Sequence, residues 1–471
     1  MSKQIPVQDV TPPAKGATNN NDLYAKREKI YTRAFTGIFR RLRMVGGAAL
    51  FLLYFGTVWL NWSGRQAVWW DLPERKFYIF GATFWPQDFM LLSWLLLVCA
   101  FGLFFITVFA GRVWCGYTCP QSVWTWIYMW CEKVTEGDRN QRIKLDKAPM
   151  SGNKLLRKTA KHSLWLLIGL VTGLTFVGYF SPIRELIPEL LTGQADGWAY
   201  FWVGFFTLAP YGNAGWLREQ VCIYMCPYAR FQSVMFDKDT LIVSYDPRRG
   251  EKRGPRKKSL DYKAQGLGDC IDCTMCVQVC PTGIDIRDGL QIECIGCAAC
   301  IDACDSIMEK MNYPKGLISY TTEHNLNGQK THLARPRLIG YAIALVLMIS
   351  ALITAVVLRP LVGFDVSKDR VLYRENELGR IENVYSLKIM NKDQQDHTYI
   401  LGAKGLEGLT LEGRRELKVA AGDILNLPME LSIEPEKLPS TTNEIVFTIE
   451  SADDPSIHKE AKSRFIGPRT R

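Results

Sequence analysis

The 471-residue sequence predicts a polytopic α-helical membrane protein with an inserted cysteine-rich domain and a C-terminal all-β sandwich. Three observations support this fold class. Charge-free apolar windows recur along the chain, two dense cysteine repeats stand before the last window, and short alternating runs follow it. The apolar residues, 48% of the chain, are therefore concentrated in segments.

Five windows lack charged residues over about the 20 residues that a bilayer span requires. A buried core helix is the alternative for each, but the charge-free length favours a membrane span. Pro210 and Gly212 interrupt the fourth window, so its second half is expected to be broken or re-entrant. The first window begins too late for a cleaved signal peptide. The windows are 44–63, 89–111, 163–182, 198–216 and 338–358.

The distribution of Lys and Arg predicts the orientation. The tail before residue 44 ends in KREKIYTRAFTGIFRRLR, and the connections 112–162 and 217–336 are also rich in basic residues. The remaining two connections contain only the basic residues Arg65, Arg75, Lys76 and Arg184. The positive-inside rule then places the N-terminus in the cytoplasm and the chain after residue 358 outside.

The expected division of the chain follows from the windows and this orientation. It comprises a cytoplasmic tail (1–43), a membrane domain with four spans (44–245), a cytoplasmic cysteine-rich domain (246–337), a fifth helix (338–358) and a periplasmic domain (359–471).

The net charge of +10 and the basic run PRRGEKRGPRKK at 247–258 raise the question of nucleic-acid binding. In a membrane protein such a run more often marks a cytoplasmic flank close to anionic lipid. Nucleic acid is therefore not an expected partner.

All fourteen cysteines precede Asp305, and the expected periplasmic segments contain none. An exported domain that needed covalent cross-links would use disulfides. The cysteines are instead expected in the membrane or on its reducing side, which favours metal ligands or redox thiols.

The spacing C-x2-C-x2-C-x3-C occurs twice between the fourth and fifth windows, in CIDCTMCVQVC and CIGCAACIDAC. Three cysteines at this spacing hold one [4Fe-4S] cluster, and the fourth ligates the other cluster. A structural zinc site needs only four thiolates, so eight favour two clusters and a ferredoxin-like electron relay. The expected ligands are Cys270, Cys273, Cys276 and Cys304 for the first cluster, and Cys294, Cys297, Cys300 and Cys280 for the second.

One position differs between the two repeats. Asp305 follows Cys304 where Pro281 follows Cys280. All eight expected ligands are nevertheless present.

A second pattern, C-x-Y-x-C-P, follows the second window as CGYTCPQSV and the fourth as CIYMCPYARFQSV. In a helix the two cysteines of each motif, at i and i+4, would share a face, and the proline would start a new helical segment. The Gln-Ser-Val after each motif indicates an internal duplication that sets the two dithiols face to face. Thiolates favour Cu(I), zinc or iron–sulfur, so the four are candidate catalytic thiols for copper or redox chemistry: Cys115, Cys119, Cys222 and Cys226.

Arg112 and Arg218 lie upstream of the two motifs and are expected to lower the thiol pKa values. The alternative for the motif cysteines is that they are buried small apolar residues. That role is the expected one for the single cysteines Cys99 and Cys131.

Other cofactors are not indicated. Only His162 of the five histidines borders a window, which argues against a bis-histidine haem, and no glycine-rich phosphate loop is present. The aromatic segment at 69–89 is expected to be an interfacial anchoring belt, with a quinone pocket as the alternative.

After residue 358 the sequence changes to short runs of period-two alternation, such as NVYSLKIMNK (383–392) and NEIVFTIES (443–451). Such runs with frequent turns predict an antiparallel sandwich of roughly 100 residues. A binding or docking module is its expected role.

The motifs together resemble those of the cytochrome c oxidase accessory proteins called CcoG, RdxA or FixG. The segments that carry the resemblance are YTRAFTGIFRRLR, DLPERKFYIFGATFWPQDF, VWCGYTCPQSVW, CIYMCPYARFQSVM and both cluster repeats. The C-terminal domain is similar to the immunoglobulin-like domain of that family.

This resemblance implies a protein of the bacterial inner membrane with its C-terminal domain in the periplasm. It also implies reduction of Cu(II) to Cu(I) on the cytoplasmic side, for assembly of the cbb-type cytochrome c oxidase. The implied partners are the bilayer, copper ion, an electron donor that stays open, copper-delivery or oxidase assembly proteins, and a second copy of the chain. Two alternatives remain at this stage: a quinol-oxidising electron-transfer subunit of a periplasmic reductase, and a non-catalytic scaffold for oxidase assembly.

Overall fold

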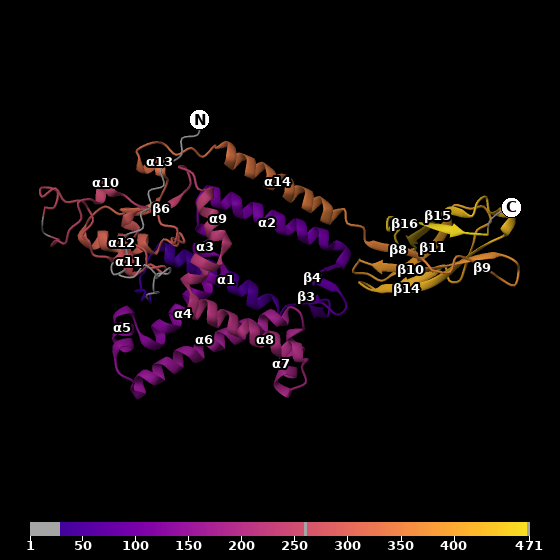
Figure 1. Ribbon diagram of the computed structural model, residues 1–471, viewed down its shortest axis with the longest axis horizontal. Helices are drawn as coiled ribbons and strands as arrows, with labels where there is room; N and C mark the ends of the chain where they lie inside the picture. The colour runs from indigo at the N-terminus through magenta and orange to yellow at the C-terminus, as the bar shows by residue number, and fades with distance from the viewer. Residues whose placement is uncertain (1–28, 259–260, 469–471) are drawn as a thin grey trace, which may run out of the picture.

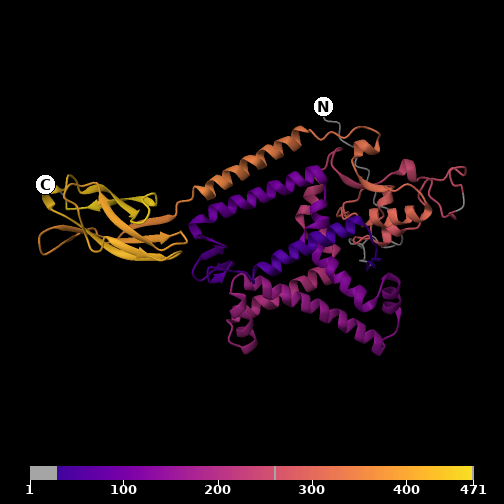
Figure 2. The same ribbon diagram turned by 180° about the vertical axis from the view of Figure 1, so that it is seen from behind.

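The computed structural model describes residues 29–258 and 261–468. Most of the tail expected at 1–43 lies outside these ranges. Helices form the middle of the molecule, with a cysteine-rich domain at one end and a β-sandwich at the other (Figure 1). The view from behind shows the same separation of the two domains (Figure 2).

Three of the described helices are long and apolar enough to cross a membrane: Pro86–Ala110, Gly152–Gly178 and Pro336–Val357. The first consists of the 3-10 turn η1 (Pro86–Asp88) and α2 (Phe89–Ala110), and the others are α6 and α14. Helices α2 and α14 contact each other along their lengths, and the apolar windows of both are unburied (Figure 1). Outward-facing apolar surface of this kind is what a lipid environment requires.

The other two expected spans differ from the sequence prediction. Helix α1 (Ile38–Thr57) begins at Ile38 rather than residue 44, and its first two turns carry Arg40, Arg41 and Arg43. Helix α8 (Gly197–Pro210) has only 14 residues before it passes into a π-helix, η2 (Tyr211–Leu217). The interruption expected at Pro210 is thus a change of helix type, in which backbone hydrogen bonds run from i to i+5.

Short helices connect these segments. They are α3 (Val113–Tyr117), α4 (Pro120–Glu136), α5 (Arg139–Lys147), α7 (Ile183–Thr192), the π-helix η3 (Val221–Met225) and α9 (Pro227–Met235). Helices α4, α6 and η2 pack together around Tyr128, Cys131 and Trp165, which are almost fully buried.

The aromatic segment at 69–89 folds as a small antiparallel sheet of β3 (Val68–Asp71), β4 (Lys76–Ile79) and β5 (Ala82–Phe84). A hairpin of β1 (Asn61–Trp62) and β2 (Arg65–Gln66) precedes it. Trp69 stacks on Tyr78 across β3 and β4, with ring centroids 5.3 Å apart.

The cysteine-rich domain is closed by an antiparallel pair, β6 (Ile242–Tyr245) and β7 (Ile318–Thr321). This pair joins the chain just before the two cysteine repeats to the chain just after them. The domain contains α10 (Pro247–Gly250), α11 (Met275–Gln278), η4 (Ile286–Asp288) and α12 (Ala299–Met311), and α13 (Glu323–Leu326) follows β7.

The C-terminal domain is a sandwich of two antiparallel sheets with the orders β12-β14-β10-β8 and β13-β11-β15-β16. Inward-facing residues alternate along the strands and bury Tyr385, Tyr399, Phe447 and Phe465 between the sheets. The expected all-β domain is therefore confirmed. Its elements are β8 (Val362–Lys368), β9 (Arg374–Glu375, paired with β10), β10 (Ile381–Asn391), β11 (His397–Lys404), β12 (Thr410–Glu412), β13 (Glu416–Val419), β14 (Ile424–Ile433), η5 (Pro435–Lys437), β15 (Thr442–Ser451) and β16 (His458–Ile466).

The sandwich meets the helical part through ionic contacts at the start of α2. Asp88 pairs with Lys392 at 2.9 Å and with Arg359 at 3.5 Å. All three side chains are largely buried, so these contacts are protected from solvent screening.

Candidate iron–sulfur and thiol site

The two cysteine repeats adopt the same unusual backbone. In each repeat the residues on both sides of the second cysteine have positive φ: Asp272 and Thr274 around Cys273, and Gly296 and Ala298 around Cys297. Left-handed residues between right-handed ones turn successive N–H groups toward one point, which makes a nest for an anionic cluster. The third cysteine of each repeat then lies at the start of α11 or α12.

The repeats line two small cavities. Cys270, Cys273, Cys276 and Cys304 line the first cavity. Cys280, Cys294, Cys297 and Cys300, together with Cys276, line the second. The structure thus brings the fourth cysteine of each repeat to the cavity formed by the other repeat.

The cysteines that line the two cavities do not form a close-set site for a single ion. In a tetrahedral zinc site with Zn–S distances of about 2.3 Å, neighbouring sulfurs lie roughly 3.8 Å apart. Within the described residues no three cysteine sulfurs lie within 4.8 Å of one another. The residues present fit two [4Fe-4S] clusters in number and chemistry.

Burial raises the pKa of the cluster-domain thiols Cys276, Cys294 and Cys304 to about 12, because a thiolate is poorly solvated there. Metal ligation requires thiolates, so assembly of the site must release protons.

The C-x-Y-x-C-P motifs do not form the continuous helices expected from sequence. Cys115 lies in α3, which ends at Tyr117, and Cys119 has extended backbone as the N-cap of α4. Likewise Cys222 lies in η3, and Cys226 is the N-cap of α9. The expected shared i, i+4 face is therefore wrong, since the prolines at N1 of the new helices force the preceding cysteine out of the helical region. The expected helix start at each proline is confirmed.

The two motifs interlock through the glutamines of the duplicated Gln-Ser-Val. Cys115 Sγ donates to Gln232 Oε1 at 3.3 Å, and Gln232 is fully buried. In the other direction, Gln121 Nε2 donates to the carbonyl oxygens of Asn213 (2.9 Å) and Arg218 (3.2 Å), just before the second motif. Each half of the duplication thus contacts the other half.

All four motif thiols are brought together. Burial raises the pKa of Cys115 to about 11, with contributions in the same direction from Cys119 and Cys226. Burial likewise raises the pKa of Cys222 to about 12, with contributions from Cys119, Cys115 and Cys226. Each motif therefore lies within electrostatic range of the other.

Arg112 lowers the pKa of Cys115, as expected, but burial outweighs this effect and the pKa of that thiol is raised overall. Arg112 is buried and donates to the carbonyl oxygens of Ala229 (2.6 Å), Cys294 (3.1 Å) and Ile292, and its lowering effect on Cys115 is smaller than that of burial. Arg218 is ion-paired with the buried carboxylate of Glu132. Arg112 instead joins the first motif, α9 and the cysteine-rich domain.

The first motif packs directly on the second cysteine repeat. A Cβ on Gly116 would lie 2.8 Å from Cys297 Cα and 2.9 Å from the Gly296 carbonyl oxygen. Cys115 packs in the same apolar cluster as Cys297 and Ile295. Gly116 was not predicted from the sequence. A signal was present, since the equivalent position of the second motif is Ile223.

Helix α12 also contacts α1 directly. Asp302, between Cys300 and Cys304, accepts the backbone N–H groups of Phe39 (3.2 Å) and Arg40 (2.8 Å). This carboxylate satisfies unpaired donors at the N-terminus of α1 and favours its positive dipole end. The contact explains why α1 begins before the apolar window.

The two single cysteines differ from each other. Cys131 is fully buried beside Tyr128 and Trp165, as expected. Cys99 is exposed on α2, so its expected burial is wrong, because α2 packs on α14 along one side only.

One further group of potential metal ligands was missed. Asp239, His324 and His332 offer ligand atoms within 4.8 Å of one another. His324 lies in α13 and His332 follows that helix, both far in sequence from Asp239, and the pairing of β6 with β7 brings these segments together.

Two regions of the chain match known protein families. Residues 217–323 match the family described as "4Fe-4S dicluster domain", a match that begins before the second thiol motif. Residues 352–468 match the family described as "IG-like fold at C-terminal of FixG".

Similar proteins match over most of the chain. The nitrogen fixation protein FixG of Rhizobium meliloti (strain 1021) is 35% identical over 454 residues, covering 88% of this chain and 86% of that protein. The proteins RdxB and RdxA of Cereibacter sphaeroides are each 39% identical and cover 84% of this chain, with 86% and 87% of their own lengths matched. With a dicluster domain and membrane-length helices on one chain, and relatives matched along nearly their whole lengths, the chain belongs to the FixG/RdxA family of iron–sulfur electron-transfer proteins.

Proposed function

We propose that this protein reduces Cu(II) to Cu(I) on the cytoplasmic side of the membrane, for assembly of a cbb-type cytochrome c oxidase. The observation that carries the proposal is the packing of Cys115 and Gly116 against Cys297. One thiol of the first motif thereby packs in the same apolar cluster as Cys297, a proposed ligand of a one-electron centre.

The proposed cluster ligands are the two sets that line the cavities. Cys270, Cys273, Cys276 and Cys304 would hold the first [4Fe-4S] cluster, and Cys294, Cys297, Cys300 and Cys280 the second. When bound, these clusters supply one-electron transfer. The backbone nests around Cys273 and Cys297 would stabilise their negative charge.

The proposed copper ligands are Cys115, Cys119, Cys222 and Cys226. The reaction takes one electron per ion, and thiolate ligands favour the Cu(I) product over Cu(II). Because burial raises the pKa of Cys115 and Cys222, copper binding there would displace thiol protons. Gln232, hydrogen-bonded to the Cys115 sulfur, would orient that thiol toward the second motif.

The cytoplasmic orientation is supported by the excess of Lys and Arg in the connections that carry the motifs and the cysteine-rich domain. On that side the proposed partners are a reduced electron donor and copper-delivery or oxidase assembly proteins. The sandwich at the opposite end would then face the periplasm.

The test is cupric reduction by the purified protein with its clusters reduced. A chelator specific for Cu(I) would report one Cu(I) per electron lost from the clusters. Replacement of all four motif cysteines by serine should abolish this yield while the cluster absorbance persists. Cys99→Ser, the same change at an exposed position outside the motifs, is the matched control and should be neutral.

Undiminished Cu(I) yield in the fourfold variant would contradict the role of the thiols. Cluster reduction by a quinol, without any reaction with Cu(II), would support the alternative of a quinol-oxidising subunit. Inertness toward both reagents would leave a scaffold.

A further inference from the structure

A cavity of about 410 Å³ lies between α1 and α4, beside the segment 32–35 that leads into α1. Its walls are mainly apolar and aromatic, including Phe35, Phe51, Trp126 and Met129. Phe35 and Trp126 also pack in the apolar cluster that contains Cys297 and Cys115, so the cavity adjoins the proposed reaction site.

One cation in this cavity has no polar partner among the described residues. Arg43 is 7% exposed, and its Nε, Nη1 and Nη2 atoms are buried without a hydrogen-bond acceptor. Its guanidinium lies 4.2 Å from the Trp126 ring centroid, which gives a cation–π contact but no counter-charge. A buried charge without a hydrogen-bonded counter-ion is strongly unfavourable, and within the described residues no acceptor meets the Arg43 nitrogens, so an anionic ligand would complete their surroundings.

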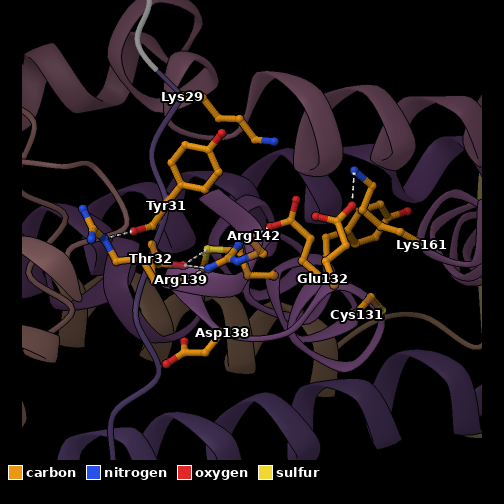
Figure 3. A network of polar contacts seen from close by, with 12 residues as sticks. Lys29, Tyr31, Thr32, Cys131, Glu132, Asp138, Arg139, Arg142 and Lys161 are labelled. Atoms are coloured by element: carbon orange, nitrogen blue, oxygen red, sulfur yellow. Dashed lines mark hydrogen bonds and ion pairs between the residues drawn. The ribbon is translucent and has the colours of Figure 1, made fainter. Parts of the chain in front are cut away.

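Two other charged groups of the cavity wall, Arg142 and Asp138, have polar partners. Arg142 pairs with Glu132 at 2.7 Å and also donates to the Thr32 carbonyl oxygen (Figure 3). The Asp138 carboxylate accepts the backbone N–H of Ala34 at 3.0 Å. In the part of the chain that the structure describes, no ion pair joins Asp138 to Arg43.

The position of Arg43 indicates what kind of acid fits. Met44, the next residue of α1, also lines the cavity and is 61% exposed, and Leu52 and Leu53 further along α1 are exposed too. An acidic head at Arg43 could therefore continue into an apolar body that lies along α1 toward the bilayer. Basic pockets between helices at the membrane surface bind anionic lipid head groups in this manner.

We propose that this cavity binds one anionic phospholipid from the leaflet on the side of the cysteine-rich domain. The phosphate accepts hydrogen bonds from the Arg43 guanidinium in the bidentate geometry that is frequent for Arg and phosphate. The acyl chains lie on the apolar surface of α1 and α4. The lipid thus supplies a counter-charge for Arg43. It also packs on the cavity wall, in which Phe35 and Trp126 belong to the same apolar cluster as Cys115 and Cys297. This site is independent of the proposed copper reduction.

The test uses the full-length protein with its clusters, purified in a neutral detergent. Phosphatidylglycerol, phosphatidylcholine and glycerol 3-phosphate are added separately, and the melting temperature and the lipid retained in native mass spectrometry are measured. We expect phosphatidylglycerol alone to raise the Tm by about 3 °C or more, with about one lipid retained per chain.

Arg43→Met should lose this shift and the retained lipid, because the cation is gone. Arg41→Met is the matched control, since Arg41 carries the same charge two residues away but is exposed, and it should keep both. Arg43→Lys should bind more weakly than the wild type and keep the preference for the anionic lipid. This variant serves as the test if Arg43→Met loses its cluster absorbance.

Three results would overturn the proposal. Equal Tm shifts for the wild type and Arg43→Met would exclude Arg43 as the contact. Equal shifts with phosphatidylcholine would exclude recognition of charge. Equal protection by glycerol 3-phosphate would show that a soluble phosphate, rather than a lipid, occupies the cavity.

Discussion

Gly116 is the residue that allows the thiol motif and the cluster domain to meet. It is one of two equivalent positions in the duplicated motifs, and the other is Ile223. Only the glycine copy faces the backbone of Gly296 and Cys297, at a distance that excludes any side chain. The duplicated motifs are therefore not equivalent in the fold, and Cys115 packs in the apolar cluster that contains Cys297 of the second repeat.

Gly116→Ala should separate the first motif from the second repeat. The added Cβ would meet backbone atoms, which cannot rotate away, and overpacking of this kind costs about 1–3 kcal/mol. We expect retained cluster absorbance, a lower melting temperature and at least a roughly tenfold loss of Cu(I) yield per unit time, equivalent to ~1.4 kcal/mol.

Gly46→Ala is the control for this change, because a Cβ at Gly46 in α1 would have no neighbour within 4 Å. A Gly116→Ala protein with unchanged stability and unchanged reduction rate would show that the close packing is not required.

At the scale of elements, α12 and α1 are coupled through Asp302. Both carboxylate oxygens are used, one for Phe39 N–H and the other for Arg40 N–H. Asp302 lies between two proposed cluster ligands, so the N-terminus of α1, a helix with exposed apolar residues, is capped by the cysteine-rich domain itself.

Asp302→Ala should destabilise the start of α1. Loss of an N-terminal cap costs about 0.5–2 kcal/mol, so we expect faster amide hydrogen exchange at residues 38–42 with the clusters retained. Asp288→Ala removes a carboxylate of the same domain that is largely exposed, and its exchange rates should equal those of the wild type. Equal exchange in both variants would contradict the capping role.

A hydrogen bond from Tyr31 to Asp146 joins the segment before α1 to α5. Tyr31 Oη donates to Asp146 Oδ2 at 2.7 Å, and Asp146 also pairs with Lys29 (2.6 Å) and Lys158 (2.5 Å). Burial, followed by the hydrogen bond to Asp146, raises the pKa of Tyr31 to about 12.

The stabilisation from Tyr31 should therefore depend on alkaline pH. A pKa raised in the folded state contributes stability that is fully present below the unfolded value, about 10 for tyrosine, and is lost as pH rises through the folded value. We expect the Tm difference between the wild type and Tyr31→Phe to be constant from pH 7 to 9 and to shrink above pH 10. Tyr373→Phe, a change at an exposed tyrosine of the sandwich, should show no such trend. A constant difference up to pH 12 would contradict the assignment.

At the scale of the whole molecule, the two domains depend on different forces. The sandwich has its own apolar core and contains no cysteine. The cysteine-rich domain has a much smaller core of its own, in which Cys270 and Cys276 are members. Its stability should therefore rest on its metal, as in small domains with few buried apolar residues.

Anaerobic removal of iron by a chelator should unfold the cysteine-rich domain and spare the sandwich. Differential scanning calorimetry is expected to show two transitions, of which only one disappears with the iron. The reference for the remaining transition is the isolated fragment 359–468, which should melt at the same temperature. Loss of both transitions together would show that the contacts of Asp88 with Lys392 and Arg359 make the two ends one cooperative unit.

The sequence by itself determined the chemistry and the classes of structure. Charge-free windows, cysteine spacing and period-two alternation are local properties, because each follows from the needs of a short segment in lipid, at a cluster or in a sheet. The apolar windows of α2, α6 and α14, the strands β10, β11 and β15, and the two cysteine repeats were therefore all visible in the sequence.

Only the tertiary structure decided how distant segments meet. Two features of this kind join residues that are far apart in the sequence: the approach of Gly116 to Cys297 and the cap of Asp302 on α1. A third, the lack of a hydrogen-bond partner for Arg43 within the described residues, depends on all the residues that surround it in the fold. The thiol pKa values show the same limit, since an upstream arginine suggests a lowered value while burial, which no local pattern reports, raises it. The spacing of residues in the sequence indicates which side chains can bind a metal or cluster, and packing determines which of them lie in contact.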